Sequence, residues 1–466
     1  MYAPLLEPVT SIQRASDSPF TSVDRSFRTV ASAASVARMT AAFSESLRVI
    51  VPHSELASFG HHKGVTRILL LLPTATYRAP DFLAAAADLG VDVVVGSEHR
   101  QALSGLMGDR AVLVPLNDVE AAVETIVALH RRSPLDAVLA VDDQGVAIAS
   151  AAAAKLGLRH NPPDAVAAAR DKTIMRARLG AASLRQPEYR VVPPGGDVVA
   201  AATQVGYPCV VKPVSRSASQ GVIRANDATE ADAAGARIRA LIADCPEPLL
   251  VERFVPGDEV ALEGLLMEGR LEVLAVFDKP DPLDGPFFEE TIYVTPSRQT
   301  PAILTEIETI AAQAAAALGL REGPVHVELR VEPGGAVTIL ELAARSIGGS
   351  CARALRFGAG VSLEEVIIRH ALGMGLGGLT REPQASGVMM LPIRAAGVLD
   401  HVSGQQRALA VEGVVGLDIS IASGRSVVPL PEGDRYLGFI FARGTTPQFV
   451  EAALRRAEAY LDVRLR

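Results

Sequence analysis

The chain has no tryptophan, and aromatic residues make up only 4% of its 466 positions. Basic residues are not in excess either, because the formal net charge at pH 7 is −8. A chain without a basic stripe lacks the electrostatic attraction that draws proteins to nucleic acid, so we expect no nucleic-acid partner. The expected partners are small molecules, with the chain acting alone or as a homodimer.

Cysteine is scarce as well. The three cysteines, Cys209, Cys245 and Cys351, have no CxxC spacing, which argues against a disulfide framework and fits a reducing cytosol. The apolar run over residues 68–73 is far too short to span a bilayer. No basic segment followed by an apolar one opens the chain, so we expect no signal peptide, no membrane partner and a cytoplasmic location.

Apolar residues are abundant, at 49%, and the chain is long enough for several domains with a large core. Residues 1–64 show weak periodicity, apart from a helical pattern over 32–47, and are expected to be a loosely attached lead-in. From residue 65 to about 160, short apolar runs alternate with helical patterns. This alternation is typical of βαβ units in a parallel sheet.

The rest of the chain reads as mixed helices and strands. We expect one helix from an N-cap at Asp164 to about residue 179. A single strand is expected over residues 249–259. The pattern restarts near residue 384, where mixed strands and a helix over 446–461 predict a small α+β module.

Two acidic residues stand out in a predicted β-hairpin over residues 325–343. Gly334 and Gly335 supply the reversal, which brings Glu328 and Glu341 side by side. Two carboxylates on adjacent strands are costly unless a cation lies between them, and Mg²⁺ takes one or two carboxylates plus substrate phosphates. The segment therefore predicts a magnesium–nucleotide site; a solvated hairpin with exposed acids is the alternative.

Lys212 ends a strand of apolar residues, so its ammonium points either into solvent or at an anion. The small-residue loop 215–221 that follows offers backbone amides and hydroxyls, as a phosphate cradle requires. A plain β-hairpin would show the same pattern. Lys172 is a solvated helix lysine unless it works together with this loop. No GxxxxGK[ST] sequence, the Walker A phosphate loop, occurs in the chain.

A third segment runs from Glu252 to Glu259. A strand between two domains can bind adenine through its backbone, and an acid further along can reach the ribose hydroxyls. The alternative is a surface strand with two unrelated acids.

Taken in chain order, these motifs resemble the ATP-grasp superfamily of carboxylate–amine ligases over roughly residues 65–380. The segment from residue 384 on resembles the C-terminal module of L-amino-acid ligases, through residues 387–392, 427–430 and 436–442. Residues 277–297 are similar to carnosine-synthase-like and bacterial dipeptide ligases. The resemblance implies an α/β and α+β multidomain protein with an ATP-grasp fold.

The implied domain division has four parts. Residues 1–64 are the lead-in, and 65–160 form an N-terminal parallel α/β domain. Residues 161–383 form the ATP-grasp domain, with a lid at about 180–250, and 384–466 form the C-terminal module.

The resemblance also assigns residues to ATP. Two lysines would hold the phosphates, a loop would close over the nucleotide, and a strand would bind the adenine and the ribose. These residues are Lys172 and Lys212 for the phosphates, Ser215, Ser217, Ser219 and Gly221 for the loop, Glu252, Arg253 and Val255 for adenine, and Glu259 for ribose.

For the metal and the chemistry, the resemblance implies that Glu328 and Glu341 hold Mg²⁺ or Mn²⁺. Arg345 would stabilise the transferred phosphate, and Gly348 and Gly349 would offer backbone amides to a developing oxyanion. Many ATP-grasp enzymes have an Asn two residues after the second Glu as a further metal ligand. Here that position is Ala343, which leaves the coordination of a second metal open.

The substrate end is assigned by resemblance to dipeptide ligases. Glu290 would pair with the α-amine of an amino-acid substrate, and Tyr293 would line its side-chain pocket. A solvated acidic pair, Glu289 and Glu290, is the alternative.

The implied reaction uses ATP to activate a carboxylate as an acyl phosphate, and the expected carboxylate is that of an amino acid. An amine then attacks it, which gives an amide or dipeptide, ADP and phosphate. One alternative is a carboxylase-like or purine-pathway ATP-grasp enzyme that activates bicarbonate or formate. Another is a non-catalytic ATP-binding regulator, against which the presence of Lys212, Glu328, Glu341 and Arg345 argues.

Overall fold

The structure is a computed structural model that describes residues 65–74, 76–100, 108–376 and 378–466. The predicted lead-in over residues 1–64 and its helix over 32–47 lie outside the described residues. Among the described helices, none combines the length and the apolar character needed to cross a membrane.

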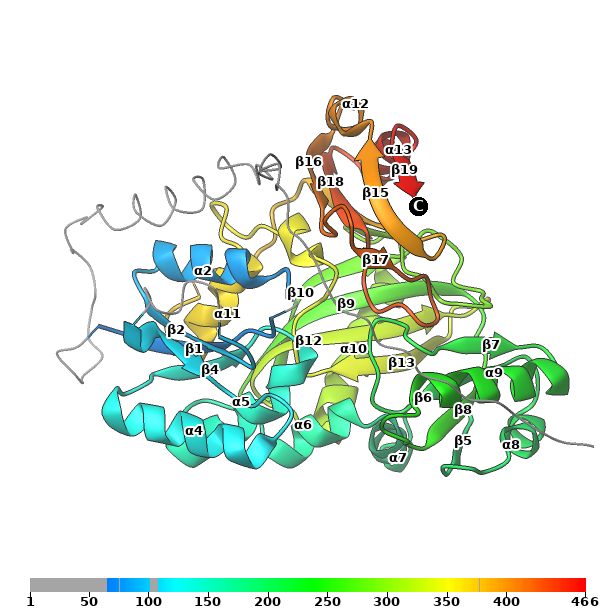
Figure 1. Cartoon of the computed structure of the whole chain (residues 1–466), viewed down its shortest axis with the longest axis horizontal. Coiled ribbons are helices and arrows are strands. Elements are labelled where there is room, and N and C mark those ends of the chain that lie inside the picture. Colours follow the sequence, from blue (N-terminus) through cyan, green and yellow to red (C-terminus); the bar gives the residue numbers. More distant parts are fainter. Residues whose placement is uncertain (1–64, 75, 101–107, 377) are drawn as a thin grey trace, which may run out of the picture. The chain divides into compact units, whose positions relative to one another are not determined.

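The N-terminal domain is a four-stranded parallel sheet in the order β3–β2–β1–β4 (Figure 1). Its elements are β1 (Arg67–Leu71), α2 (Ala79–Asp88), β2 (Asp92–Ser97), β3 (Ala111–Leu113), α4 (Val119–Arg132), β4 (Ala137–Ala140) and α5 (Asp143–Leu156). The predicted βαβ alternation is confirmed. The strand order changes direction between β1 and β4, and ligands of open parallel sheets bind beyond the carboxyl ends of the strands at such a point.

The helix predicted over residues 164–179 is two helices, α6 (Pro163–Arg170) and α7 (Lys172–Ala181). Asp171 interrupts them: its extended backbone ends α6, and its carboxylate accepts hydrogen bonds from the N–H groups of Thr173 and Ile174. Asp171 is therefore the N-cap of α7, and the prediction of an N-cap at Asp164 was wrong, because Asp164 lies within the first turn of α6.

A small antiparallel sheet follows, in the order β5–β8–β6–β7. Its elements are β5 (Tyr189–Val192), α8 (Val198–Val205), β6 (Cys209–Pro213), β7 (Ile223–Ala225), α9 (Ala228–Leu241) and β8 (Leu249–Arg253). The two helices share a core of buried apolar residues with the strands. This unit falls within the segment predicted to be a lid.

The largest sheet has eight strands in the order β13–β12–β9–β10–β11–β14–β18–β16 (Figure 1). Its first five strands in the sequence are β9 (Asp258–Met267), β10 (Arg270–Asp278), β11 (Ile292–Thr295), β12 (Gly323–Val331) and β13 (Val337–Ala343). Helix α10 (Pro301–Leu318) buries Ile307, Ile310 and Ala311 in a core shared with β12 and β13.

The single strand predicted over residues 249–259 is two strands in two sheets, β8 and β9. The break falls at Gly257, whose φ is +115°, and a Cβ there would lie 2.1 Å from the carbonyl oxygen of Val331. Only glycine fits this close approach, so the chain turns from the small sheet into the large one at this point.

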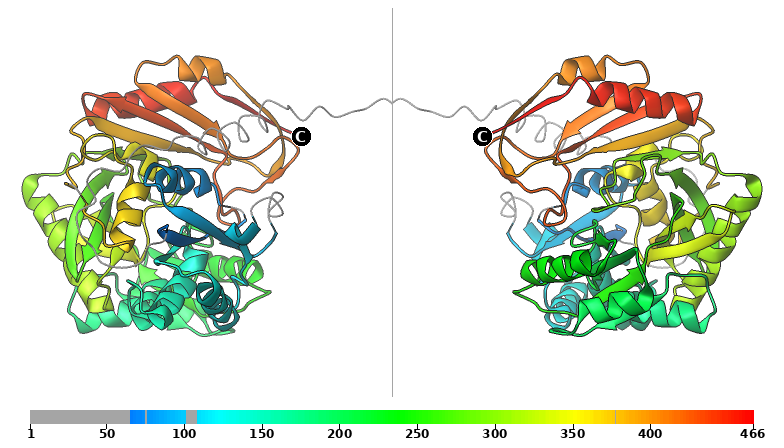
Figure 2. Two further views of the ribbon diagram at one scale, coloured as in Figure 1. Left: turned by 90° about the vertical axis from the view of Figure 1, so that its left-hand side faces the viewer. Right: turned by 90° about the vertical axis from the view of Figure 1, so that its right-hand side faces the viewer.

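The C-terminal segment extends the large sheet with β14 (Ala385–Leu391), β16 (Val414–Ile419) and β18 (Gly438–Gly444). A second sheet contains β15 (Gly397–Ser403), β17 (Ser426–Val427) and β19 (Asp462–Leu465); the segment also contains α12 (Gln405–Leu409) and α13 (Pro447–Glu458). Helix α13, red in Figure 2, contacts β14 and β18. The large sheet thus contains strands from both sides of the domain boundary predicted at residue 383.

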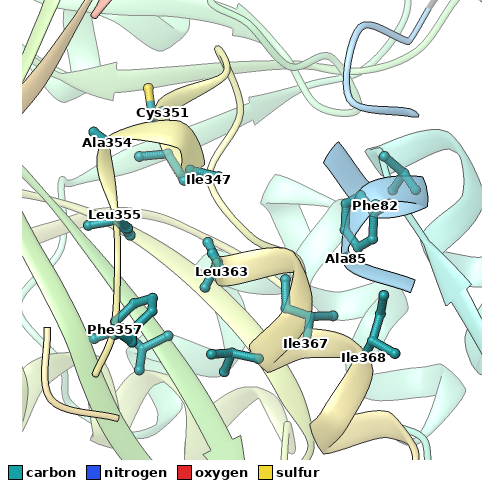
Figure 3. Packing of buried hydrophobic residues seen from close by; sticks show 14 of the residues in the cluster. Phe82, Ala85, Ile347, Cys351, Ala354, Leu355, Phe357, Leu363, Ile367 and Ile368 are labelled. Carbon is teal, nitrogen blue, oxygen red and sulfur yellow. The ribbon is translucent and has the colours of Figure 1, made fainter. Parts of the chain in front are cut away.

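One apolar core joins the N-terminal domain to the large sheet. Helix α11 (Leu363–Ala371) contributes Leu363, Ile367 and Ile368 to it, and α2 contributes Phe82 and Ala85 (Figure 3). Strand residues of β9, β10, β14 and β18 belong to the same cluster. Because these parts share a core, the residues they present to one cavity are held on a common rigid frame.

Candidate active site

A cavity of about 420 Å³ is lined by four parts of the chain. Tyr77 and Asp143 come from the N-terminal domain, at the carboxyl ends of β1 and β4. The small sheet contributes Lys212, the large sheet contributes Glu328, and the loop before β18 contributes Tyr436. A pocket built from several domains with convergent polar groups is the usual setting of an active site.

Most residues that the sequence assigned to ATP, metal or substrate line this cavity. They are Lys172, Lys212, Ser217, Ser219, Glu252, Arg253, Val255, Glu259, Glu290, Tyr293, Glu328, Glu341, Arg345, Gly348 and Gly349. Two assigned residues, Ser215 and Gly221, are not among the described residues that line the cavity. The N–H of Ser215 faces Glu247, and the N–H of Gly221 donates to the carbonyl of Pro431 at 2.9 Å. These two residues therefore shape the base of the loop.

The predicted pairing of the two acids in the hairpin is confirmed. Glu328 on β12 lies directly opposite Glu341 on β13, so both side chains emerge on the same face of the sheet. Lys172 Nζ lies 3.1 Å from Glu341 Oε1 and donates to the carbonyl of Arg216 at 2.8 Å. Hard carboxylate oxygens beside lysines are a donor set that fits Mg²⁺ with nucleotide phosphates.

Lys212 belongs to a buried ionic group at the junction of the small sheet and α7. Its Nζ lies 2.7 Å from one carboxylate oxygen of Glu252, and Arg176 Nε lies 2.6 Å from the other. Burial opposes ionisation of Glu252, but the two cations outweigh it and lower its pKa to about 2. Glu252 therefore fixes the position of Lys212, a role that the sequence did not suggest.

Two backbone groups expected to bind adenine are engaged within the protein. The N–H of Arg253 donates to the carbonyl of Glu188, and the carbonyl of Val255 accepts a hydrogen bond from Arg330. The cavity is also lined by apolar residues that could contact a planar base, here called the apolar wall. Its members are Pro187, Val210, Val222, Phe254, Leu283 and Leu340.

Lys279, which the sequence analysis did not single out, lies among three of the predicted site acids. Its Nζ is 2.7 Å from Glu259, 2.5 Å from Glu290 and 3.3 Å from Glu328. Burial opposes the charge on Lys279, but the three carboxylates outweigh it and raise its pKa well above the usual value. The sequence held one signal for this residue, an Asp-Lys pair at the end of an apolar strand.

Glu290 faces both Lys279 and the aromatic end of the cavity. Its Oε1 accepts a hydrogen bond from the Tyr293 hydroxyl at 2.6 Å, and its Oε2 lies 3.4 Å from the Tyr436 hydroxyl. Glu289, in contrast, is not among the described residues that line the cavity, and burial raises the pKa of its carboxyl. The two neighbouring acids thus have different surroundings, as alternation along an extended segment requires.

Arg345 is held by an acid from another domain. Its Nε lies 2.7 Å from Asp143 Oδ1, at the start of α5. Burial opposes ionisation of Asp143, but Arg345 outweighs it and lowers the pKa of the carboxyl. Asp143 follows β4 at the point where the sheet order reverses, and this position was the available signal in the sequence.

The glycines after Arg345 adopt a tight loop. Gly349 has a φ of +58°, and a Cβ there would lie 2.5 Å from the sulfur of Met390. Its N–H donates to the Tyr77 hydroxyl at 2.8 Å. The buried Glu263 fixes the start of this loop, because its carboxylate accepts a hydrogen bond from the N–H of Ile347 at 2.9 Å.

The loop before β18 connects the C-terminal segment to the small sheet. Arg237 on α9 makes two contacts with the carboxylate of Glu432, at 2.6 and 2.9 Å. Gln220 donates to the carbonyl of Glu432 at 2.9 Å. Asp434, Arg435 and Tyr436, further along the same loop, line the cavity.

Three family models match separate segments of the chain. An ATP-grasp N-terminal domain matches residues 83–160, an ATP-grasp domain matches 205–354, and an L-amino acid ligase C-terminal domain matches 389–466. The resemblance inferred from the sequence is therefore confirmed.

Curated relatives resemble the chain at low identity. An alanine–anticapsin ligase of Bacillus subtilis is 26% identical over 269 residues, which cover 53% of this chain and 56% of the relative. A formate-dependent phosphoribosylglycinamide formyltransferase of Sulfurovum sp. is 26% identical over 242 residues, covering 51% of this chain and 59% of the relative. The chain thus spans little more than half of the length of these relatives.

A solved structure shares the fold over nearly the whole described chain. The crystal structure of an L-amino acid ligase from Bacillus licheniformis superposes with a TM-score of 0.73 at 23% identity. The match covers 87% of this chain and 100% of that structure. The expected fold class is confirmed.

Proposed function

We propose that this chain, an ATP-grasp protein with an L-amino acid ligase C-terminal domain, is an ATP-dependent carboxylate–amine ligase. The terminal phosphoryl group of ATP passes to a substrate carboxylate, most simply that of an amino acid, and ADP is released. The nitrogen of an amine then attacks the carbonyl carbon of the acyl phosphate. The C–O bond to phosphate breaks, the amine loses a proton, and an amide or dipeptide forms.

In this proposal, Lys172 and Lys212 bind the nucleotide phosphates, and Glu259 binds the ribose. The base lies against the apolar wall, with the carbonyl of Arg253 and the N–H of Val255 as its backbone partners. Glu328 and Glu341 hold the divalent cation, Mg²⁺ or Mn²⁺, which neutralises phosphate charge when bound.

Arg345, aimed into the cavity by Asp143, stabilises the charge of the transferred phosphoryl group. The N–H of Gly348 is the backbone donor assigned to the developing oxyanion, because that of Gly349, expected to share this role, donates to the Tyr77 hydroxyl. The loop 215–221 and the loop that carries Glu432 contact each other, and both contribute residues to the cavity lining. In this proposal they keep water from the reactive acyl phosphate.

One observation supports this proposal above the others: a single cavity holds the opposed pair Glu328 and Glu341 together with Lys172, Lys212 and Arg345. The test is a panel of amino acids offered singly and in pairs with Mg-ATP, with ADP and phosphate release measured. Release that needs both a carboxylate and an amine supports the ligase. ADP and phosphate release that depends on bicarbonate or formate would favour the carboxylase-like or purine-pathway alternative. ATP binding without ADP release would favour a regulator.

Glu290→Ala should raise the KM of the amino-acid substrate and leave the KM of ATP nearly unchanged. Its Oε2 faces the cavity, so its loss removes a charge-assisted contact of about 2 kcal/mol, or about 30-fold. Glu289→Ala is the matched control, because Glu289, unlike Glu290, is not among the described residues that line the cavity. Equal, small effects of the two substitutions on KM would remove Glu290 from the substrate site.

A further inference from the structure

The ammonium of Lys279 occupies the centre of an acidic cluster. Lys279 directly follows β10, and its N–H donates to the carbonyl of Glu259 at 3.1 Å, which continues the sheet ladder. Its side chain is only 3% exposed. The residue is therefore fixed at both ends, by the sheet and by the three carboxylates that its Nζ contacts.

The carboxylate oxygens of Glu259, Glu290 and Glu328 lie within 4.8 Å of one another, a spacing that suits a metal ion. Three ionised carboxylates at this distance repel one another, the more so because Glu259 is buried and Glu290 and Glu328 are half-buried. Other cations reach single members of the cluster: Arg330 lies 3.1 Å from Glu259, and His326 lies 3.6 Å from Glu328. Among the described residues, Lys279 is the one cation recorded in contact with all three.

The three carboxylates belong to three different tasks. Under the function proposed above, Glu259 binds the ribose, Glu328 holds the metal and Glu290 receives the substrate amine. One ammonium therefore touches the nucleotide end, the metal end and the substrate end of the cavity.

We propose that Lys279 is a positioning residue that takes the place of a cation between Glu259, Glu290 and Glu328 and orients all three. The inference rests on the proposed function for the roles of the three acids. A lysine held at the end of a strand keeps the cluster neutralised before any substrate arrives, which a dissociable ion would not do.

The first test measures metal binding without nucleotide, so that it does not depend on turnover. Lys279→Met keeps the apolar stem but removes the charge, which leaves three carboxylates without their common cation. Titration with Mn²⁺, followed by electron paramagnetic resonance, should show one more bound ion per chain than in the wild type. Lys279→Arg and the exposed Lys155→Met should bind as the wild type does. No additional ion in Lys279→Met would overturn the proposal.

A second test covers the case in which Lys279→Met folds poorly. If repulsion among the acids is the cause, adding Glu290→Gln should restore most of the lost melting temperature, because one of the three charges is removed. If Lys279 merely fills space, the double variant will be no more stable than the single one, and the proposal fails.

Kinetics separate this role from that of Glu290 alone. Lys279→Met should raise the KM of ATP and the KM of the amino acid together, each by at least 10-fold, whereas Glu290→Ala raises the second alone. Lys279→Arg should show smaller increases in the KM of ATP and in the KM of the amino acid than Lys279→Met. An effect of Lys279→Met on kcat with both KM values unchanged would contradict a positioning role. If no ligase activity were found, the proposed function would fail, but the Mn²⁺ titration would still test the role of Lys279, because it does not depend on turnover.

Discussion

Glu341→Gln is expected to abolish turnover in a protein that remains folded. Glu341 lies directly opposite Glu328, and its Oε1 contacts Lys172 at 3.1 Å. A glutamine keeps the size of the side chain and an oxygen that can accept from Lys172, so the packing survives. It loses the negative charge, and a neutral amide is a much poorer ligand for Mg²⁺ than a carboxylate.

The expected loss of kcat/KM exceeds about 100-fold, since outer-sphere partners of metal ligands already account for 10- to 100-fold effects. It is measured as ADP release under saturating ATP, with circular dichroism and the melting temperature as folding checks. Glu308→Gln, an exposed position on α10, is the control for the substitution itself. Turnover of Glu341→Gln within about twofold of the wild type would show that the metal assignment is wrong.

Lys212→Ala is expected to weaken ATP binding by about 30-fold, which corresponds to the loss of a charge-assisted contact of about 2 kcal/mol. Lys212 is buried beside the cavity and is held by Glu252 at 2.7 Å. Its removal leaves Glu252 paired with Arg176, so the buried carboxylate keeps one cation and the fold should persist. The affinity is measured by isothermal titration calorimetry with Mg-ATP.

ATP should also raise the melting temperature of the wild type by mass action, and this shift should shrink in Lys212→Ala. Lys155→Ala, at an exposed position, is the matched control and should bind ATP as the wild type does. Equal ATP affinity in Lys212→Ala and the wild type would remove Lys212 from the nucleotide site.

Local patterns in the sequence predicted those elements whose side-chain period is unambiguous. The strand–helix alternation of the N-terminal domain and the hairpin that opposes Glu328 to Glu341 follow from apolar spacing and from Gly334 and Gly335. Two boundaries were wrong because a single residue decided each of them. Asp171 ends one helix and caps the next, and Gly257 turns the chain from one sheet into another.

The order of residue types along the chain was enough to indicate a family, and most of the residues assigned on that basis line the cavity. Which charges neutralise one another became clear from the folded arrangement alone. The ionic contacts of the cavity join residues from separate strands or domains. They are Lys279 with Glu259, Glu290 and Glu328, Arg345 with Asp143, and Lys212 with Glu252. The reason is physical: Coulomb energy depends on distance in space, and contacts between residues far apart in the chain leave no periodic trace in the sequence.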